Sequence, residues 1–367
     1  MPDARAQNFE DRLDAMRQEA KHGVVGRGVD VSGGPIPRSV GYFSEAVVKP
    51  PVWTWEIPLY FFIGGAAGMA PLIACAGLFL GQLDLMRAAL WIAAAGAITS
   101  PILLIMDLGR PMLFLNMLRV FKHRSPMSVG AWTLFLFGAF AVPACLLLEL
   151  YANDAFAPSV APLVLFVAGV LTVGTAISGL GLATYTGVLL GATAIPAWFL
   201  HRVFLPMHFG TAGLGCAAAI LELLGFQIRP LYALGMVVAI IETLLWIWLE
   251  LDKNGPADRA LHRGSAGWLI RGGAVLCGPL PIVLRLTNFI SLAAISFLFG
   301  ALLSRFGWIA AGRVSGRDPE AVFASRNIKV KVARTVGAEG RHLKLTFEDE
   351  RGANYDSIGF RLRARHK

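Results

Sequence analysis

The chain has 367 residues, of which 56% are apolar and only 16% are charged, and its formal net charge is +9. Soluble domains average about 45–50% apolar and about 25% charged residues. The segment from Ala155 to His201 contains no Asp, Glu, Lys or Arg, which is typical of membrane-spanning helices. The composition therefore excludes intrinsic disorder, a disulfide scaffold and a soluble α/β enzyme, and it indicates an all-α polytopic membrane protein.

Residues 1–52 are polar and begin without the apolar core of a signal peptide. We expect a soluble N-terminal segment with an amphipathic surface helix over Asn8–Ala20. Eight apolar segments follow, each near the ~20 residues that a membrane span requires: Ile57–Leu80, Arg87–Met106, Val129–Leu150, Val160–Leu190, Val203–Leu224, Leu231–Leu249, Trp268–Leu284 and Asn288–Ala311. The seventh is flanked by Arg271 and Arg285, which would have to extend toward the membrane surface. Seven spans with a re-entrant segment there are the alternative.

The basic residues indicate an orientation. With eight spans, 14 Lys and Arg residues lie near the span ends on the side of the two termini, and 3 lie on the other side. Cytoplasmic loops are enriched in Lys and Arg, so we expect both termini in the cytoplasm.

The tail over residues 313–367 forms a separate region with 13 Lys and Arg and 7 Asp and Glu residues. Polar and apolar residues alternate over Ile328–Ala333, His342–Glu348 and Ser357–Ala364, which predicts a small β unit. Such a basic tail is either solvated and lipid-facing or docks a partner protein. We expect no nucleic-acid partner.

The cysteines and histidines limit the chemistry. Each of the four cysteines stands alone in an apolar stretch, with no C-x-x-C or ferredoxin-type motif. We therefore expect no iron–sulfur cluster and no c-type haem in this chain. Only His201 and His208 lie near apolar segments, both at one predicted helix end, so the sequence does not predict a b-type haem site.

Intramembrane carboxylates are functional candidates, because a charge in hydrocarbon costs roughly 2.5–3.5 kcal/mol. The acidic residues within spans or at their ends are Glu56, Asp107, Glu149, Glu222 and Glu242. Glu242 is the deepest, and either it is protonated and bonded to a neighbouring helix or it belongs to a proton path. Glu149 and Glu222 each lie about one turn from a span end, which predicts an interfacial position.

Two pairs of residues near span ends give more specific hypotheses about function. Glu56 and Tyr60 are four residues apart and share a helical face, so they could hydrogen-bond a quinone carbonyl and exchange its proton. The alternative is an aromatic belt with Glu56 as a helix cap. Asp107 and Arg110 either neutralise each other or tune a proton-accepting group beside a cavity.

These motifs resemble the NrfD / polysulfide reductase membrane-subunit family over about residues 41–311. The segments that carry the resemblance are Pro50-Pro-Val-Trp53-Thr-Trp55-Glu56-Ile-Pro-Leu-Tyr60-Phe-Phe-Ile-Gly64-Gly65, Asp107-Leu-Gly-Arg110-Pro, Phe114-Leu-Asn-Met-Leu-Arg119-Val-Phe, Ser125-Pro-Met-Ser128-Val-Gly130-Ala-Trp132, and Tyr185-Thr-Gly187-Val-Leu-Leu with Pro196-Ala-Trp198.

The resemblance implies an eight-helix domain over residues 53–312, built as two four-helix bundles in a bacterial cytoplasmic (inner) membrane. It also implies a subunit without its own metal cofactor that oxidises or reduces a quinone, menaquinone or ubiquinone. Electrons would pass to or from a ferredoxin-like iron–sulfur subunit, which often contacts a molybdopterin-type catalytic subunit. In the best-studied arrangement that partner lies on the outer face, whereas the charge count places the same side in the cytoplasm.

By matching position, the resemblance implies that Glu56, Tyr60 and Tyr185 line the quinone pocket, with Asp107 and Arg110 beside it. Protons would leave through Glu56 or Asp107. Family members often have histidine or asparagine where this chain has Glu56 and its neighbours.

Two other classes of function stay open at this point. An ion pump or solute transporter would use intramembrane carboxylates such as Glu242 and Asp107, together with Arg110, as its path. A structural anchor would bind a partner through the basic tail and perform no redox chemistry.

Overall fold

The computed structural model describes residues 48, 53–108, 111–252, 255–325, 329–337, 340–348, 354–355 and 359–360. Arg110 and the helix expected at Asn8–Ala20 lie outside the described residues. The helices and strands are, in order, α2 (Glu56–Phe79), α3 (Leu83–Asp107), η2 (Pro111–Leu118), α4 (Pro126–Ala152), α5 (Ala161–Gly191), α6 (Pro196–Leu200), α7 (Phe204–Leu223), α8 (Arg229–Leu251), η3 (Gly255–Asp258), α9 (Arg259–His262), α10 (Gly264–Cys277), α11 (Pro279–Leu286), α12 (Ile290–Arg317), α13 (Pro319–Ser325), β1 (Lys329–Gly337), β2 (Gly340–Glu348), β3 (Asn354–Tyr355) and β4 (Gly359–Phe360).

Among the described residues, eight helical segments are long and apolar enough to cross a membrane, which confirms the predicted number of spans. The seventh runs over Gly264–Leu286 and is divided into α10 and α11. Its break lies at Gly278, directly before Pro279, the first residue of α11. Proline has no N–H to continue the hydrogen-bond ladder of a helix but is well suited to starting one. The seven-span alternative is therefore not the arrangement that the structure adopts.

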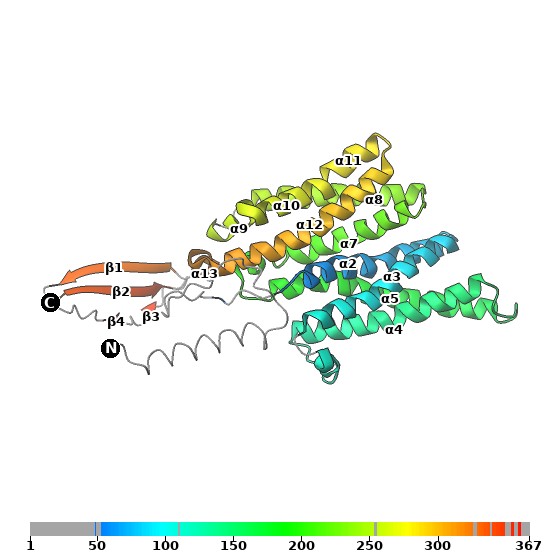
Figure 1. The fold of residues 1–367 in the computed structure, drawn as a ribbon, viewed down its shortest axis with the longest axis horizontal. Coiled ribbons are helices and arrows are strands. Elements are labelled where there is room, and N and C mark those ends of the chain that lie inside the picture. The colour runs from blue at the N-terminus through cyan, green and yellow to red at the C-terminus, as the bar shows by residue number, and fades with distance from the viewer. Residues whose placement is uncertain are drawn as a thin grey trace, which may run out of the picture.

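The spans form two four-helix bundles that lie side by side, as Figure 1 shows. The first bundle consists of α2, α3, α4 and α5, and the second of α7, α8, α10 with α11, and α12. Helix α2 packs against α3 and α5 of its own bundle and against α7 and α12 of the other. It is therefore the central helix of the seam between the bundles.

Close approach of α2 to α5 and α7 depends on glycine. A Cβ atom on Gly68 of α2 would lie 2.5 Å from the carbonyl oxygen of Gly179 on α5. One on Gly213 of α7 would lie 2.7 Å from the carbonyl oxygen of Gly65 on α2. The glycine-rich start of the first span is thus a packing surface, as small residues at helix crossings predict.

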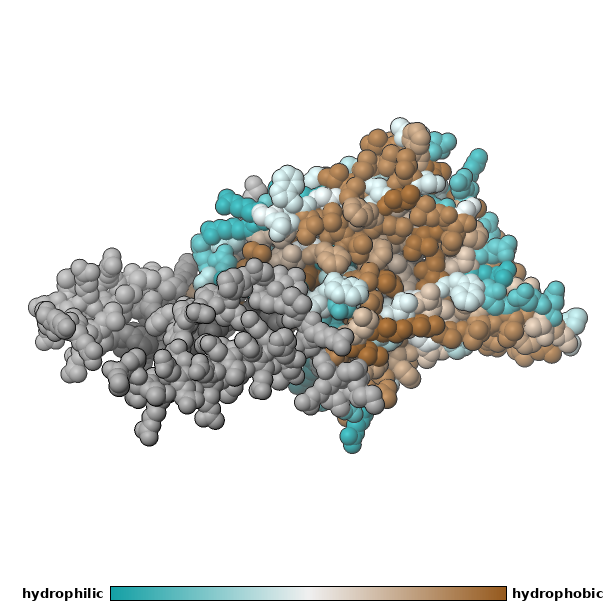
Figure 2. Space-filling model, viewed as in Figure 1, coloured by the Kyte–Doolittle hydropathy of each residue, from teal (hydrophilic) through white to brown (hydrophobic). Residues whose placement is uncertain are grey.

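The flanks of the helices carry exposed apolar side chains, which form a continuous apolar surface in Figure 2. Trp91 on α3 is 54% exposed, and Phe166 and Ile177 on α5 are 68% and 71% exposed. In water such a surface would be an interaction or aggregation site, whereas lipid chains cover it without cost. The structure is that of a multi-pass membrane protein.

The two ends of the helical body differ. One end, which we call the α13 end, carries η2, α6, η3, α9 and α13, together with the start of α2 (Figure 1). Only short turns connect the spans at the opposite end.

The C-terminal strands follow α13. Strands β1 and β2 pair antiparallel, with Lys329 opposite Glu348, and β3 and β4 each pair with β2. The first two predicted strands thus correspond to β1 and β2. Within the third, Ser357–Ala364, the described part is β4.

Candidate functional site

A cleft with about 650 Å³ of empty space enters the first bundle near the α13 end, between α2, α3, η2, α4 and α5. Three of its lining residues carry a hydroxyl or carboxyl group: Tyr60, Asp107 and Tyr185. The remaining lining residues are Trp53, Ile57, Phe61, Leu104, Leu108, Phe114, Met117, Met127, Gly130, Ala131, Leu134 and Leu189. A mostly apolar cleft with a few polar groups is suited to a planar apolar ligand that has polar atoms at its edge.

The two tyrosines come from helices that are adjacent in the bundle. Tyr60 lies in the second turn of α2 and is 2% exposed, and Tyr185 lies on α5 and is partly buried. The Tyr60 ring packs against the Phe61 ring at a centroid distance of 5.6 Å. Within the described part of the chain neither hydroxyl makes a hydrogen bond. Both are therefore available to a ligand in the cleft.

A threonine connects the two predicted carboxylates. The Thr54 hydroxyl donates a hydrogen bond to Glu56 Oε2 and lies 3.3 Å from Asp107 Oδ1. A hydroxyl has one proton to donate, so it can bond one of the two carboxylates at a time. The start of α2 and the end of α3 are thereby joined, although Glu56 and Asp107 are far apart in the sequence.

Glu56 does not line the cleft itself, since its contact with the cleft passes through Thr54 and Asp107. Tyr60 and Asp107 line the cleft, and Glu56 lies beside it, hydrogen-bonded to Thr54. Helix geometry allows Glu56 and Tyr60 on one face, but the helix start places Glu56 one turn farther out.

The wall of the cleft is anchored to the second bundle by stacked aromatic rings. The Trp53 and Trp198 rings are stacked at a centroid distance of 5.4 Å and an interplanar angle of 14°. The Trp198 indole donates a hydrogen bond of 2.8 Å to the carbonyl oxygen of Trp308 on α12. These contacts join Trp53, on the wall of the cleft, to helix α12 of the second bundle.

Sequence reasoning missed Thr54 and Gly130. Thr54 lies two residues before Glu56 at a helix start, where a hydroxyl commonly bonds a nearby side chain or backbone group. The position of Thr54 at a helix start was therefore the signal from which its hydrogen bond could have been predicted. Gly130 on α4 lies directly against the Tyr185 ring on α5. No local signal predicts this contact, because it depends on the neighbouring helix.

The other acidic residues lie away from the cleft. Glu149 accepts hydrogen bonds from Arg87 and from the Trp91 indole, as an interfacial residue can. Glu222 is 4% exposed and ion-paired with Arg285 at 2.7 Å. Arg285 is 3% exposed, so its guanidinium is paired within the bundle.

Glu242 belongs to the second bundle, and Asp107 to the first. The two residues line different pockets, Glu242 the cavity within the second bundle and Asp107 the cleft of the first. Across the described residues, no three His, Cys, Asp or Glu side chains gather so as to hold a metal ion.

Comparison with known proteins gives the same family for most of the chain. The model described as "Polysulphide reductase, NrfD" matches residues 44–315. The C subunit of polysulfide reductase from Wolinella succinogenes is 26% identical over 308 residues, which cover 71% of this chain and 94% of that protein. A second model, described as the RecJ OB domain, matches residues 317–367, the region for which the sequence predicts a β unit.

Proposed function

Because this chain belongs to the polysulphide reductase NrfD family, we propose that it is the quinone-reactive membrane subunit of a redox complex. It exchanges electrons between the membrane quinone pool and an iron–sulfur partner subunit. The observation that carries this proposal is the cleft of the first bundle, which brings Tyr60, Tyr185 and Asp107 together on an otherwise apolar lining. A quinone has the matching chemistry, with an apolar ring and two oxygens at its edge.

The polar residues of the cleft have separate roles in quinol oxidation. The Tyr60 and Tyr185 hydroxyls donate hydrogen bonds to the ring oxygens and fix the orientation of the ring. Asp107 accepts a proton from a quinol hydroxyl, and the Thr54 hydroxyl connects it to Glu56 at the outer end of a proton relay. Each quinol releases two protons and two electrons, and the electrons leave to the partner. Quinone reduction runs the same steps in reverse.

The α13 end is the docking face for the iron–sulfur partner in this proposal, because the cleft lies near that end. A molybdopterin-type catalytic subunit would contact the partner there and determine the substrate. The name of the Wolinella relative marks it as one subunit of polysulfide reductase, which supports a multisubunit complex for this chain too. By the count of basic residues, the α13 end faces the cytoplasm.

Replacing Glu56 with Gln tests the proposal. We expect quinol oxidation by the complex, purified in mild detergent, to fall by about 100-fold or more, since positioned acid–base groups contribute about 10²–10⁴-fold. The matched control is Glu149→Gln, which changes a carboxylate of the same bundle that lies outside the cleft. Normal turnover by the Glu56→Gln variant would show that the site assignment is wrong.

Mass spectrometry of the same preparation tests the partner assignment. Iron–sulfur and molybdopterin-type subunits should be recovered together with this chain. A chain that is recovered alone and without bound quinone would contradict the proposed function as a whole.

A further inference from the structure

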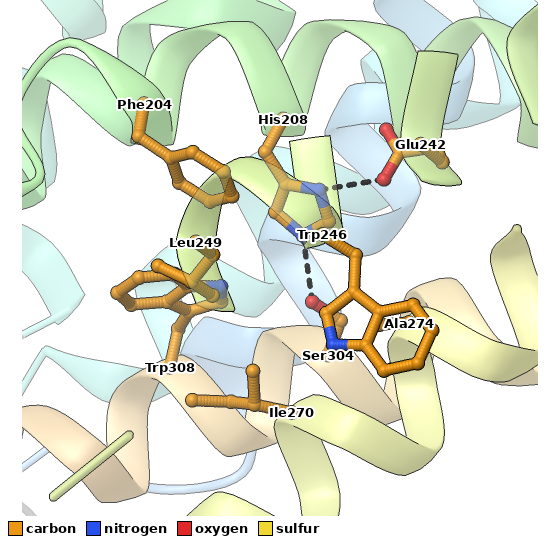
Figure 3. A pocket seen from close by; sticks show the side chains of 9 residues that line it. All are labelled: Phe204, His208, Glu242, Trp246, Leu249, Ile270, Ala274, Ser304 and Trp308. Atoms are coloured by element: carbon orange, nitrogen blue, oxygen red, sulfur yellow. Dashed lines mark hydrogen bonds and ion pairs between the residues drawn. The ribbon is translucent and has the colours of Figure 1, made fainter. Parts of the chain in front are cut away.

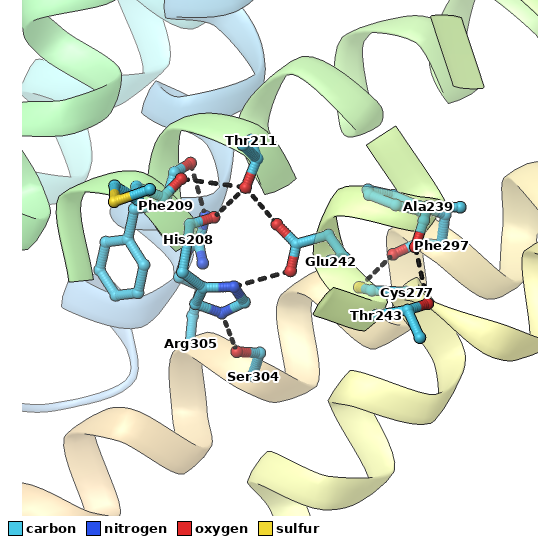
Figure 4. Close-up of polar contacts among 11 residues, drawn as sticks. His208, Phe209, Thr211, Ala239, Glu242, Thr243, Cys277, Phe297, Ser304 and Arg305 are labelled. Carbon is cyan, nitrogen blue, oxygen red and sulfur yellow. Dashed lines mark hydrogen bonds and ion pairs between the residues drawn. The ribbon is translucent and has the colours of Figure 1, made fainter. Parts of the chain in front are cut away.

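The second bundle contains a buried histidine whose two ring nitrogens are both hydrogen-bonded to side chains (Figure 4). His208 Nδ1 on α7 lies 2.7 Å from Glu242 Oε2 on α8, and His208 Nε2 lies 2.7 Å from Ser304 Oγ on α12. Thr211 donates a hydrogen bond to the other carboxylate oxygen of Glu242. The exposed fractions of His208 and Glu242 are 6% and 3%. Three helices thus converge on one ionisable pair.

This arrangement is compatible with two protonation states. In the neutral ring, Nδ1–H donates to Glu242 and Nε2 accepts from the Ser304 hydroxyl. When one proton is added at Nε2, the imidazolium donates at both nitrogens, and the Ser304 hydroxyl rotates to accept. The pair therefore gains or loses one proton without leaving a ring nitrogen unpaired.

A buried cation lies beside the pair. Arg305 on α12 is 1% exposed, donates to the Phe209 carbonyl oxygen at 3.1 Å and lies over the Phe209 ring. Its Nε and Nη1 atoms have no hydrogen-bond partner among the described residues. Glu242 acts on Arg305 electrostatically, and Cys216 and Cys277 are the other titratable groups that face this centre.

With His208 neutral, the negative charge of Glu242 balances the positive charge of Arg305. Adding a proton to His208 leaves one net positive charge in a buried place, which opposes permanent protonation. The hydrogen bond to the Glu242 carboxylate acts in the other direction, because it stabilises the imidazolium.

A cavity connects this pair with further polar groups (Figure 3). The centre of a water-sized sphere can occupy about 20 Å³ of it, and His208, Glu242 and Ser304 all line it. Its other lining residues are Phe204, Trp246, Leu249, Ile270, Ala274 and Trp308. A polar site of this size has room for a water molecule, which is the species that would carry a proton to the ring.

The same kind of pair recurs farther along α8, toward the α13 end. Glu250 lies eight residues after Glu242, which is about 12 Å along a helix. It is 3.3 Å from His262 and 2.7 Å from Arg271. The Trp246 indole on the cavity wall donates to Glu250 at 3.3 Å. The cavity therefore lies between a buried pair and a partly exposed one.

We propose that His208 and Glu242 form a proton-binding site in the second bundle, separate from the cleft of the first, which takes up and releases one proton through this cavity. A purely structural pair would keep one protonation state at all pH values at which the protein is folded.

Nuclear magnetic resonance of the full chain in lipid nanodiscs, with ¹⁵N-labelled histidine and without quinone or partner subunits, tests this proposal. The His208 resonances are assigned by their loss in His208→Gln. We expect their chemical shifts to change reversibly between about pH 5 and 8, the range in which histidine titrates. Chemical shifts that stay constant across this range overturn the proposal.

A pair of serine variants tests the site even where His208→Gln does not fold, because the readout is then whether the midpoint of any one histidine resonance differs between the two variants. Ser304→Ala removes the acceptor of the charged ring, so the titration midpoint should move down by roughly half to one pH unit. The control is Ser315→Ala, which changes a buried serine of the same helix that bonds Gly312 and Ala197 instead. Equal midpoints in the two variants contradict the site. Quinone is absent throughout, so the result is independent of the quinone proposal.

Discussion

Gly130 on α4 lies against the ring of Tyr185 on α5, so closely that a Cβ atom at position 130 would overlap the ring. Both residues line the cleft. The position of the Tyr185 hydroxyl, which the proposed function assigns to a quinone oxygen, therefore depends on the absence of a side chain on the neighbouring helix.

Replacing Gly130 with Ala should displace the Tyr185 ring and lower kcat/KM for quinol by about tenfold or more, because small errors of position at a reacting centre are costly. The measurement is quinol oxidation by the purified complex. Gly138→Ala is the matched control on the same helix, because a Cβ atom there would meet only the Ala97 side chain, at 3.9 Å. Equal losses in both variants would mean that α4 tolerates alanine poorly in general.

Replacing Tyr185 with Phe removes the hydroxyl and keeps the ring. Since one neutral hydrogen bond contributes about 0.5–1.5 kcal/mol, the dissociation constant for quinone should rise by roughly two- to tenfold. Binding of a quinone analogue to the complex, followed by fluorescence quenching, measures this constant. Tyr232→Phe is the control, because the Tyr232 hydroxyl bonds the Arg285 carbonyl oxygen in the second bundle. Unchanged affinity in Tyr185→Phe would exclude this hydroxyl from the site.

Most of the fold could be predicted from the sequence, because long apolar runs report membrane spans directly. The predicted span Val160–Leu190 and helix α5, Ala161–Gly191, differ by one residue at each end. Glycines within an apolar span are typical of close helix packing, and α2 meets both α5 and α7 at glycine pairs. Each of these signals lies within a single segment of the sequence.

The pairings between helices could not be predicted, because they depend on which helix faces share the interior. Glu222 and Arg285 each lie near the end of a span, and nothing in the sequence indicates that they bond each other between α7 and α11. Likewise, the sequence identified Glu242 as the deepest carboxylate but not its partner His208. A single sequence does not show which residues of two neighbouring helices face each other.

The Thr54 bridge can be tested by two substitutions of similar size. Thr54→Val removes the hydroxyl between Glu56 and Asp107, so proton release from the cleft should slow and kcat for quinol oxidation should fall by about tenfold or more. Thr54→Ser keeps a hydroxyl at the same place and should retain most of the activity. Similar rates in the two variants would show that the hydroxyl takes no part in the relay.

The Glu222–Arg285 pair should be the most sensitive charged contact of the second bundle for stability. Its two N–O distances are 2.7 Å and both residues are buried. Glu222→Gln leaves the Arg285 guanidinium buried without a counter-charge, which typically costs about 3–5 kcal/mol of the free energy of unfolding. Thermal unfolding of the purified chain in detergent, followed by circular dichroism, should show a clearly lower Tm.

The double variant Glu222→Leu with Arg285→Met distinguishes the effect of losing the ion pair from the effect of leaving one buried charge without a partner. Removing both charges should recover most of the lost Tm, because apolar replacement of a whole buried pair is often neutral. The exposed pair of Arg259 with Glu320 serves as the control, since its side chains are 49% and 62% exposed and such pairs contribute little to stability. If Glu222→Gln unfolds no earlier than Glu320→Gln, Arg285 must find another partner within the bundle, and the pair is not what holds α11 against α7.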